Sequence, residues 1–101
     1  MAHLFSPLTI AGVTLPNRVV MAPLMSQCAD ADGFVGKALY DYYMQRVHGG
    51  VGLLVTEPAL VVPPPPDSMR SHLGLYADAF IPGLRHLAQS VHGGGARMLI
   101  S

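Results

Sequence analysis

The most informative segment of this chain is Asn17-Arg18-Val19-Val20-Met21-Ala22-Pro23-Leu24-Met25-Ser26. Its centre, Val19 to Met21, is a compact apolar run that follows a polar pair and ends just before a proline-containing turn. This pattern predicts a short strand buried on both faces, as in parallel sheets. In α/β proteins the loop at the carboxyl end of such a strand usually carries the ligand. The segment after Met21 is therefore the first candidate for a binding site.

The composition limits the classes of function. The 101 residues include six Lys or Arg and six Asp or Glu, so 12% are charged, against about 25% in typical globular domains. Much of the surface is therefore expected to be covered by something else. The balanced charge argues against nucleic-acid binding. A single cysteine, Cys28, excludes an internal disulfide and fits the cytoplasm. We expect neither a secretory signal at the N-terminus nor a membrane-spanning segment.

The chain begins with a predicted β-hairpin and continues with a predicted helix. Residues 8–10 and 13–15 are short apolar runs around Ala11-Gly12, which is typical of a hairpin turn. Residues 37–48 place Leu39, Tyr43 and Val47 on one helical stripe, and Gly49-Gly50 follows as a stop signal.

The second half repeats a strand and helix pattern. Residues 51–56 predict a buried strand, residues 78–92 a helix with Asp78 as its N-cap, and residues 96–100 a third strand. Pro82 falls in the first turn of this helix, where a missing N–H is tolerated. The apolar stripe of the helix is predicted to contain Ile81, Leu84, Leu87 or Ala88, and Val91.

The order of these elements predicts an α/β fold with a parallel sheet. Glycines 49, 50, 52 and 93–95 follow helices and precede strands, which is the wrong position for a dinucleotide-binding fingerprint. The sequence therefore favours a (β/α)₈ barrel. Three parallel strands with two helices cannot cover both faces of a sheet, so we expect the N-terminal part of a larger α/β protein.

Several other motifs carry little chemistry. Asp30 and Asp32 before Gly33 indicate a turn rather than a calcium loop. The five histidines lack metal-ligand spacing, and no metal site is predicted. Glu57, at the end of a strand, could point into a site or anchor a loop, and we assign it no acid–base role. Residues Pro63–Pro66 predict a stiff loop or, as an alternative, a polyproline segment for a partner.

A family resemblance covers essentially the whole chain. Residues 4–10, 15–24 and 49–57, together with Tyr43, Arg46 and the later Leu73-Gly74-Leu75-Tyr76 and Ile81-Pro82-Gly83-Leu84, resemble Old Yellow Enzyme-type NADH:flavin oxidoreductases. The resemblance implies an FMN-containing (β/α)₈, or TIM, barrel, of which residues 1–101 form the N-terminal segment of a single domain: a hairpin, about three strands and two helices. It implies that NAD(P)H reduces the flavin, whose N5 then passes hydride to an activated alkene, an enone or enoyl thioester.

The resemblance also implies site residues. Ala22, Pro23, Leu24 and Met25 match the segment that lies against the flavin ring, Pro58 and Ser101 match two further flavin positions, and Gln27 lies near a substrate position. The side chain of Met25 has no hydrogen to donate, and Pro58 has no backbone N–H. Ser101 is shorter than the glutamine usual in relatives. In the family, the substrate-binding histidines, the tyrosine proton donor and the phosphate clamp come later. No catalytic residue is therefore predicted here, and we expect the chain alone to be inactive and to bind FMN weakly.

Two alternatives stay open at this point. One is a non-catalytic half-barrel that binds a partner through Pro63–Pro66 or an exposed sheet edge and needs a second chain. The other is a barrel enzyme with a phosphorylated substrate and no flavin. The expected partners are a small alkene and, as homo-oligomer or complementing C-terminal chain, another polypeptide. An iron–sulfur cluster would belong only to an unseen C-terminal extension, as in some relatives.

Overall fold

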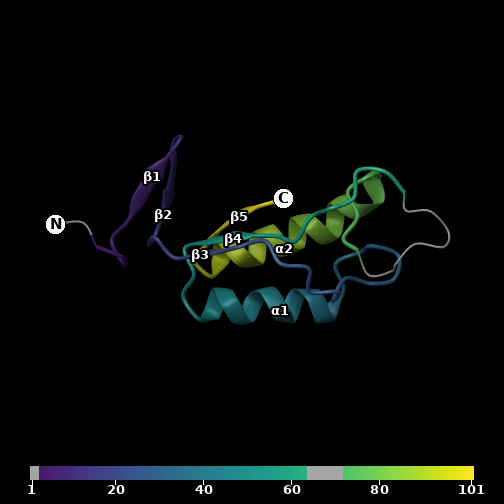
Figure 1. Cartoon of the computed structure of the whole chain (residues 1–101), viewed down its shortest axis with the longest axis horizontal. Helices are drawn as coiled ribbons and strands as arrows, with labels where there is room; N and C mark the ends of the chain where they lie inside the picture. Colours follow the sequence, from purple (N-terminus) through teal and green to yellow (C-terminus); the bar gives the residue numbers. More distant parts are fainter. Residues whose placement is uncertain (1–2, 64–71) are drawn as a thin grey trace.

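The computed structural model describes residues 3–63 and 72–101. Most of the predicted proline loop, from Pro64 onward, lies outside the described residues, so the proposed polyproline segment is not placed. Within the described ranges the chain forms an N-terminal hairpin, then a parallel sheet with two helices (Figure 1).

The hairpin consists of β1 (Leu8–Ile10) and β2 (Val13–Leu15), which pair antiparallel as predicted. Its two turn residues, Ala11 at φ 50° and Gly12 at φ 82°, both adopt positive φ. Positive φ at both central residues gives a turn whose twist matches that of the flanking strands. The hydroxyls of Thr9 and Thr14 lie 2.9 Å apart and hydrogen-bond across the pair.

The sheet contains β3 (Val20–Met21), β4 (Leu53–Val55) and β5 (Arg97–Leu99), parallel and in that spatial order. Helix α1 (Lys37–His48) joins the first two strands, and α2 (Ile81–Gly93) joins the last two. The predicted α/β alternation is confirmed, and α1 has the predicted bounds. The strands are shorter than predicted, because ladder pairing extends over only two or three residues.

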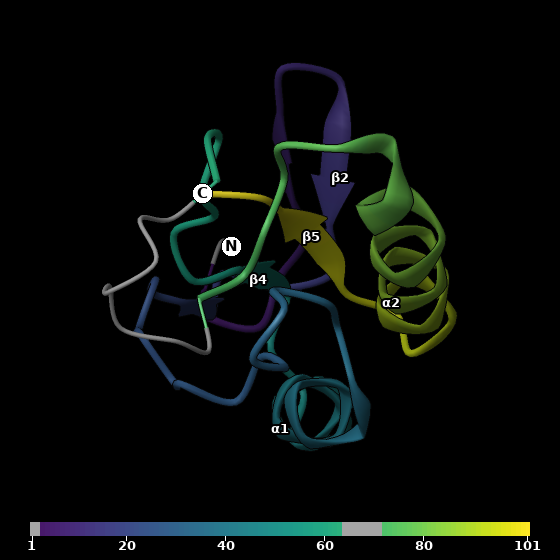
Figure 2. The same cartoon turned by 90° about the vertical axis from the view of Figure 1, so that its right-hand side faces the viewer.

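The core lies between the sheet and the helices. The predicted stripe of α1, Leu39, Tyr43 and Val47, is buried. Helix α2 contributes Leu84, Leu87 and Val91, and Leu54 of β4 is fully buried in the same cluster. Figure 2 looks onto the carboxyl ends of the strands and shows both helices on one side of the curved sheet.

The other face of the sheet is open, so the predicted burial of the first strand on both faces is wrong. Val20 of β3 is 50% exposed and Leu99 of β5 is 56% exposed. The pleat explains this pattern: Leu54 points towards the helices, whereas Leu53 and Val55 share the opposite face with their partners Arg97 and Leu99. The apolar residues of these strands therefore alternate between two faces of the sheet. The described helices cover one face, and the other is open.

The start of α2 also differs from the prediction. Asp78 does not cap the helix but begins a 3₁₀ turn (Asp78–Phe80), and Phe80 takes the N-cap position of α2. The extra turn buries Phe80, and Ile81, predicted for the apolar stripe, is 43% exposed. Pro82 falls in the first turn, as predicted, where its missing N–H costs no helical hydrogen bond.

Candidate functional site

The structure brings the predicted cofactor residues to one edge of the sheet. Ala22 to Met25 directly follow β3, Pro58 comes just after β4, and Ser101 comes just after β5. Because the strands are parallel neighbours, their carboxyl ends lie side by side, at the end that faces the viewer in Figure 2. This is the edge at which α/β barrels carry their sites.

The ends of β4 and β5 are joined by hydrogen bonds. The N–H of Ala59, next to Pro58, donates to the carbonyl of Ser101 at 3.2 Å, and the N–H of Thr56 donates to that of Leu99 at 2.9 Å. The N–H of Ser101 donates to Thr56 Oγ1 at 3.2 Å. Both backbone polar groups of Ser101 are therefore engaged, and its hydroxyl is the group left to meet a ligand.

The surface at these strand ends is apolar. Ala22, Pro23, Leu24 and Met25 are exposed, and so is Pro58. A row of exposed apolar side chains at a ligand-binding edge suits one face of a flat, largely apolar group. The residues present therefore fit one wall for an isoalloxazine ring.

Gln27, the predicted substrate residue, stands out by its backbone. It is exposed and has φ 58°, in the left-handed region that non-glycine residues seldom occupy. The conformation costs about 1–2 kcal/mol. Strain of this kind is often found at binding and catalytic positions, and the role of Gln27 near the substrate stays a prediction.

Beneath the apolar wall lies a buried carboxyl group. Glu57 is fully buried, and its Oε1 accepts hydrogen bonds from Ser26 Oγ at 2.5 Å and from Tyr43 Oη at 3.3 Å. The N–H of Glu57 donates to Tyr43 Oη at 2.8 Å. Thr56 Oγ1 donates to the carbonyl of Glu57 at 3.1 Å. Within the described residues, Glu57 Oε2 has no hydrogen-bond partner.

Tyr43 has its acidity changed by this environment. Burial of the hydroxyl raises the pKa of Tyr43 well above its ordinary value, and the neighbouring Glu57 carboxylate adds to the rise by repelling a phenolate. The hydrogen bond from the Glu57 N–H lowers this pKa; its effect is smaller than that of burial and larger than that of the carboxylate's repulsion. Tyr43 is therefore a neutral hydroxyl that can both donate to and accept from Glu57.

This hydrogen-bonded group was only partly visible in the sequence. The sequence predicts Tyr43 as part of an apolar stripe. It leaves Glu57 with two possible roles, in a site or as the anchor of a loop, and assigns no role to the side chains of Ser26 and Thr56. One signal was available: a hydroxyl-bearing aromatic on a buried stripe needs a polar partner. The partner could not be named, because Tyr43 and Glu57 are 14 residues apart and Ser26 and Glu57 are 31 apart.

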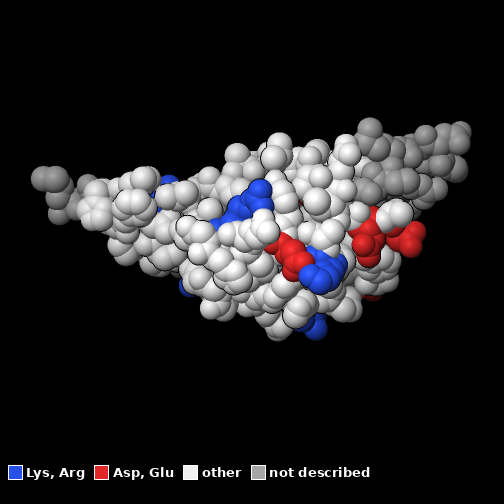
Figure 3. Space-filling model, turned by 90° about the horizontal axis from the view of Figure 1, so that it is seen from below, with Lys and Arg blue, Asp and Glu red and all other residues white. Residues whose placement is uncertain are grey.

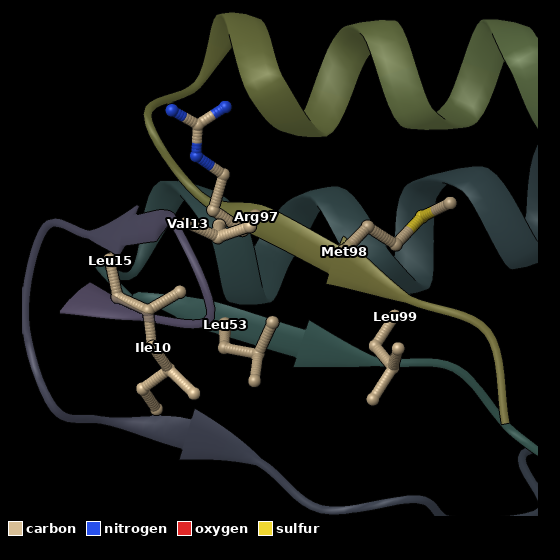
Figure 4. Close-up of a pocket in the computed structure, with 7 residues that line it drawn as sticks. All are labelled: Ile10, Val13, Leu15, Leu53, Arg97, Met98 and Leu99. Atoms are coloured by element: carbon tan, nitrogen blue, oxygen red, sulfur yellow. The ribbon is translucent and has the colours of Figure 1, made fainter. Parts of the chain in front are cut away.

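A separate apolar groove of about 220 Å³ lies between the hairpin and the open sheet face. Figure 4 shows its lining from both hairpin strands and from β4 and β5. The guanidinium Nε of Arg97 donates to the carbonyl of Thr14 at 3.4 Å and ties β5 to the hairpin. The groove is thus distinct from the predicted cofactor edge. Its lining residues are Ile10, Val13, Leu15, Leu53, Arg97, Met98 and Leu99.

Charged side chains are sparse on the face that carries α1. Figure 3 shows them there as a few scattered spots of both signs, and Lys37 and Asp41 form an ion pair on α1. Across residues 3–63 and 72–101, no helix is long and apolar enough to cross a bilayer. The same ranges hold no group of three or more potential metal-ligating side chains.

Comparison with known proteins places this arrangement in a family. The model of the NADH:flavin oxidoreductase / NADH oxidase family matches residues 3–101. The chain belongs to this family. It is 37% identical over 98 residues to an NADH oxidase of Thermoanaerobacter brockii, covering 97% of this chain and 15% of that protein. It is 42% identical over 96 residues to an NADPH dehydrogenase of Geobacillus sp. (strain WCH70), covering 94% and 28% respectively.

Solved structures of Old Yellow Enzyme type share the fold. Morphinone reductase superposes with a TM-score of 0.81 at 32% identity, over 96% of this chain and 25% of that one. Old Yellow Enzyme from Pichia sp. AKU4542 gives 0.84 at 25% identity, with the same shares. The chain thus has the fold of part of an Old Yellow Enzyme-type TIM barrel, and it spans between 15% and 28% of the two curated relatives. The family implies FMN as the cofactor and NAD(P)H as the electron donor.

Proposed function

We propose that residues 1–101 are the N-terminal segment of a single FMN-binding TIM-barrel domain in an NAD(P)H-dependent reductase of activated alkenes. The observation that carries the proposal is the exposed apolar wall of Ala22 to Met25 and Pro58 at two neighbouring strand ends, with Ser101 at the third and the buried hydrogen bonds of Glu57 supporting the wall. Family membership supports the flavin, and the single cysteine agrees with the proposed cytoplasmic location.

Each predicted residue has a proposed task. Ala22, Pro23, Leu24 and Met25 pack against one side of the isoalloxazine ring, and Pro58 extends this surface. The hydroxyl of Ser101 offers a hydrogen bond to the ring edge. Gln27 reaches the alkene substrate. Bound FMN supplies the hydride chemistry, from NAD(P)H to the β-carbon of an enone or enoyl thioester. The phosphate clamp, the proton donor and any iron–sulfur cluster are assigned to other parts of the complete protein.

A second candidate function has its own support. The open sheet face, with Val20 and Leu99 about half exposed, is a surface that would bury apolar area against further strands. The second candidate is a non-catalytic half-barrel or partner-binding module, in which a second chain would supply those strands; in the whole barrel they would come from the same chain. A homo-oligomer built on this face would be a third arrangement.

The test compares the 101-residue chain with the complete protein, meaning the polypeptide that carries this segment together with the remaining barrel strands. We expect the complete protein to purify with bound FMN, to oxidise NADH or NADPH, and to reduce 2-cyclohexen-1-one. The chain alone should show neither tight FMN binding nor turnover. A complete protein without flavin would refute the proposal, and a yellow, active 101-residue chain would refute the assignment of the missing parts.

A further inference from the structure

Glu57 is linked to each element that meets at the predicted flavin wall, through its carboxyl to the loop after β3 and to α1, and through its backbone carbonyl and Thr56 to Ser101. Through Oε1 it accepts from Ser26, the residue next to Met25, and from Tyr43 of α1. Its own backbone precedes Pro58, and its carbonyl accepts from Thr56, whose Oγ1 in turn accepts from the Ser101 N–H. Pro58 is thus the next residue, Met25 adjoins a residue that is hydrogen-bonded to Glu57, and Ser101 is two hydrogen bonds away through Thr56.

The connection to the loop after β3 is particularly direct. Ser26 Oγ donates to Glu57 and also accepts the N–H of Cys28 at 3.2 Å. This hydroxyl is a direct polar link between that loop and the residue that follows Thr56. Without the carboxylate, Ser26 would lose its acceptor, and the backbone from Met25 to Cys28 would lose its anchor.

Burying a carboxyl group for packing alone is unfavourable. Glu57 is fully buried, and one of its oxygens has no hydrogen-bond partner within the described residues. An apolar residue at this position would avoid the cost of desolvating the carboxyl. A buried carboxyl that is hydrogen-bonded to the loop after β3 and to α1 therefore indicates a task beyond filling space.

We propose that Glu57 is a positioning residue for the flavin: by fixing Ser26 and Tyr43 it sets the place of the Met25 and Pro58 wall against the ring. The inference rests on the proposed function. Glu57 acts through neighbouring groups and needs its Oε1 acceptor rather than its charge. Glutamine, which keeps that oxygen, should therefore replace it, whereas alanine should not.

The experiment uses the complete protein with the variants Glu57→Ala, Glu57→Gln and Ser26→Ala. Thr9→Val serves as the control, because it removes a side-chain hydrogen bond of the exposed hairpin instead. The readouts are the FMN dissociation constant, the flavin midpoint potential, and the labelling rate of Cys28 by a thiol reagent, followed on the Cys28 peptide by mass spectrometry.

We expect Glu57→Ala and Ser26→Ala to weaken FMN binding about tenfold, the effect of ~1.4 kcal/mol, which is typical of losing one hydrogen bond. Both should shift the midpoint potential and speed Cys28 labelling. The FMN dissociation constant of Glu57→Gln should stay within about threefold of the parent value. Thr9→Val should match the parent in all three readouts. Should Glu57→Ala fail to fold, Ser26→Ala provides the same comparison.

Folded Glu57→Ala and Ser26→Ala proteins with parental affinity, potential and labelling rate would overturn the inference. So would a Glu57→Gln protein as impaired as Glu57→Ala, since the charge would then matter, or an equal loss in Thr9→Val, which would indicate a general effect of stability. If the parent protein binds no FMN, the proposed function fails. The labelling rate of Cys28 then still decides whether Glu57 positions the loop.

Discussion

Removing the hydroxyl oxygen of Tyr43 should destabilise the chain far more than the same change at the adjacent Tyr42. Tyr43→Phe keeps the fully buried ring, so no cavity forms. It removes the acceptor of the Glu57 N–H, at 2.8 Å, and a weaker donor to Oε1, at 3.3 Å. A buried donor left without a partner costs about 1–3 kcal/mol. With the second bond also lost, we expect unfolding to become easier by about 2 kcal/mol.

The matched control is Tyr42→Phe. The Tyr42 ring packs edge-on against Tyr43, with centroids 5.6 Å apart, and holds the Arg46 guanidinium 3.9 Å from its centroid. Both contacts survive loss of the hydroxyl, so the cost should stay below about 0.5 kcal/mol.

Urea unfolding followed by far-ultraviolet circular dichroism measures both variants, and an unchanged m-value verifies that the same surface is exposed. A loss of about 2 kcal/mol corresponds to a fall in Tm of roughly 8–16 °C for a domain of this size. If Tyr43→Phe and Tyr42→Phe cost the same within about 0.5 kcal/mol, the Glu57 N–H has found another partner. The reasoning about the buried network would then be refuted.

Two further predictions concern pH and packing. Because burial raises the folded-state pKa of Tyr43 above the ordinary value of 10.0, the folded state holds its proton where the unfolded state releases it. This contribution to stability is complete below about pH 10 and is lost as pH rises above it. The free energy of unfolding should therefore fall less steeply with alkaline pH in Tyr43→Phe than in the parent. Equal pH dependence in the two proteins would contradict the prediction. Gly94→Ala should destabilise the chain by about 1–3 kcal/mol, because its Cβ would overlap Val47 Cγ1, whereas Gly93→Ala, whose Cβ meets nothing within 4 Å, should be neutral or slightly stabilising. Thermal melts of both glycine variants give the comparison, and equal Tm values would count against it.

Local signals predicted the fold well. Ala11-Gly12 predicted the hairpin turn, the spacing of Leu39, Tyr43 and Val47 predicted α1, and the strand–helix order predicted a parallel sheet. Each depends on residues close in sequence. The predictions fail where tertiary packing decides the local structure. The sequence predicts Asp78 as the N-cap of α2, but a 3₁₀ turn begins there and places Phe80 in the core.

The candidate site was predictable by position more than by chemistry. The family resemblance singled out Ala22 to Met25, Pro58 and Ser101, and the order of parallel strands was enough to place them at one edge. The hydrogen bonds among Ser26, Tyr43 and Glu57 could not be foreseen, because they join residues from a loop, a helix and a strand end. Such contacts exist only once the sheet and α1 have packed.

The one-sided sheet has a consequence for how the protein is made. The hairpin pairs residues close in sequence, whereas the parallel sheet pairs Val20 with Leu53 and Leu53 with Arg97, and parallel pairing over such separations forms slowly. While the later strands are absent, β3 and β5 remain edges and Val20 and Leu99 face water. Edges of this kind pair readily with other chains. The nascent protein should therefore depend on chaperone binding at this face until barrel closure, and slow translation beyond this segment should increase aggregation.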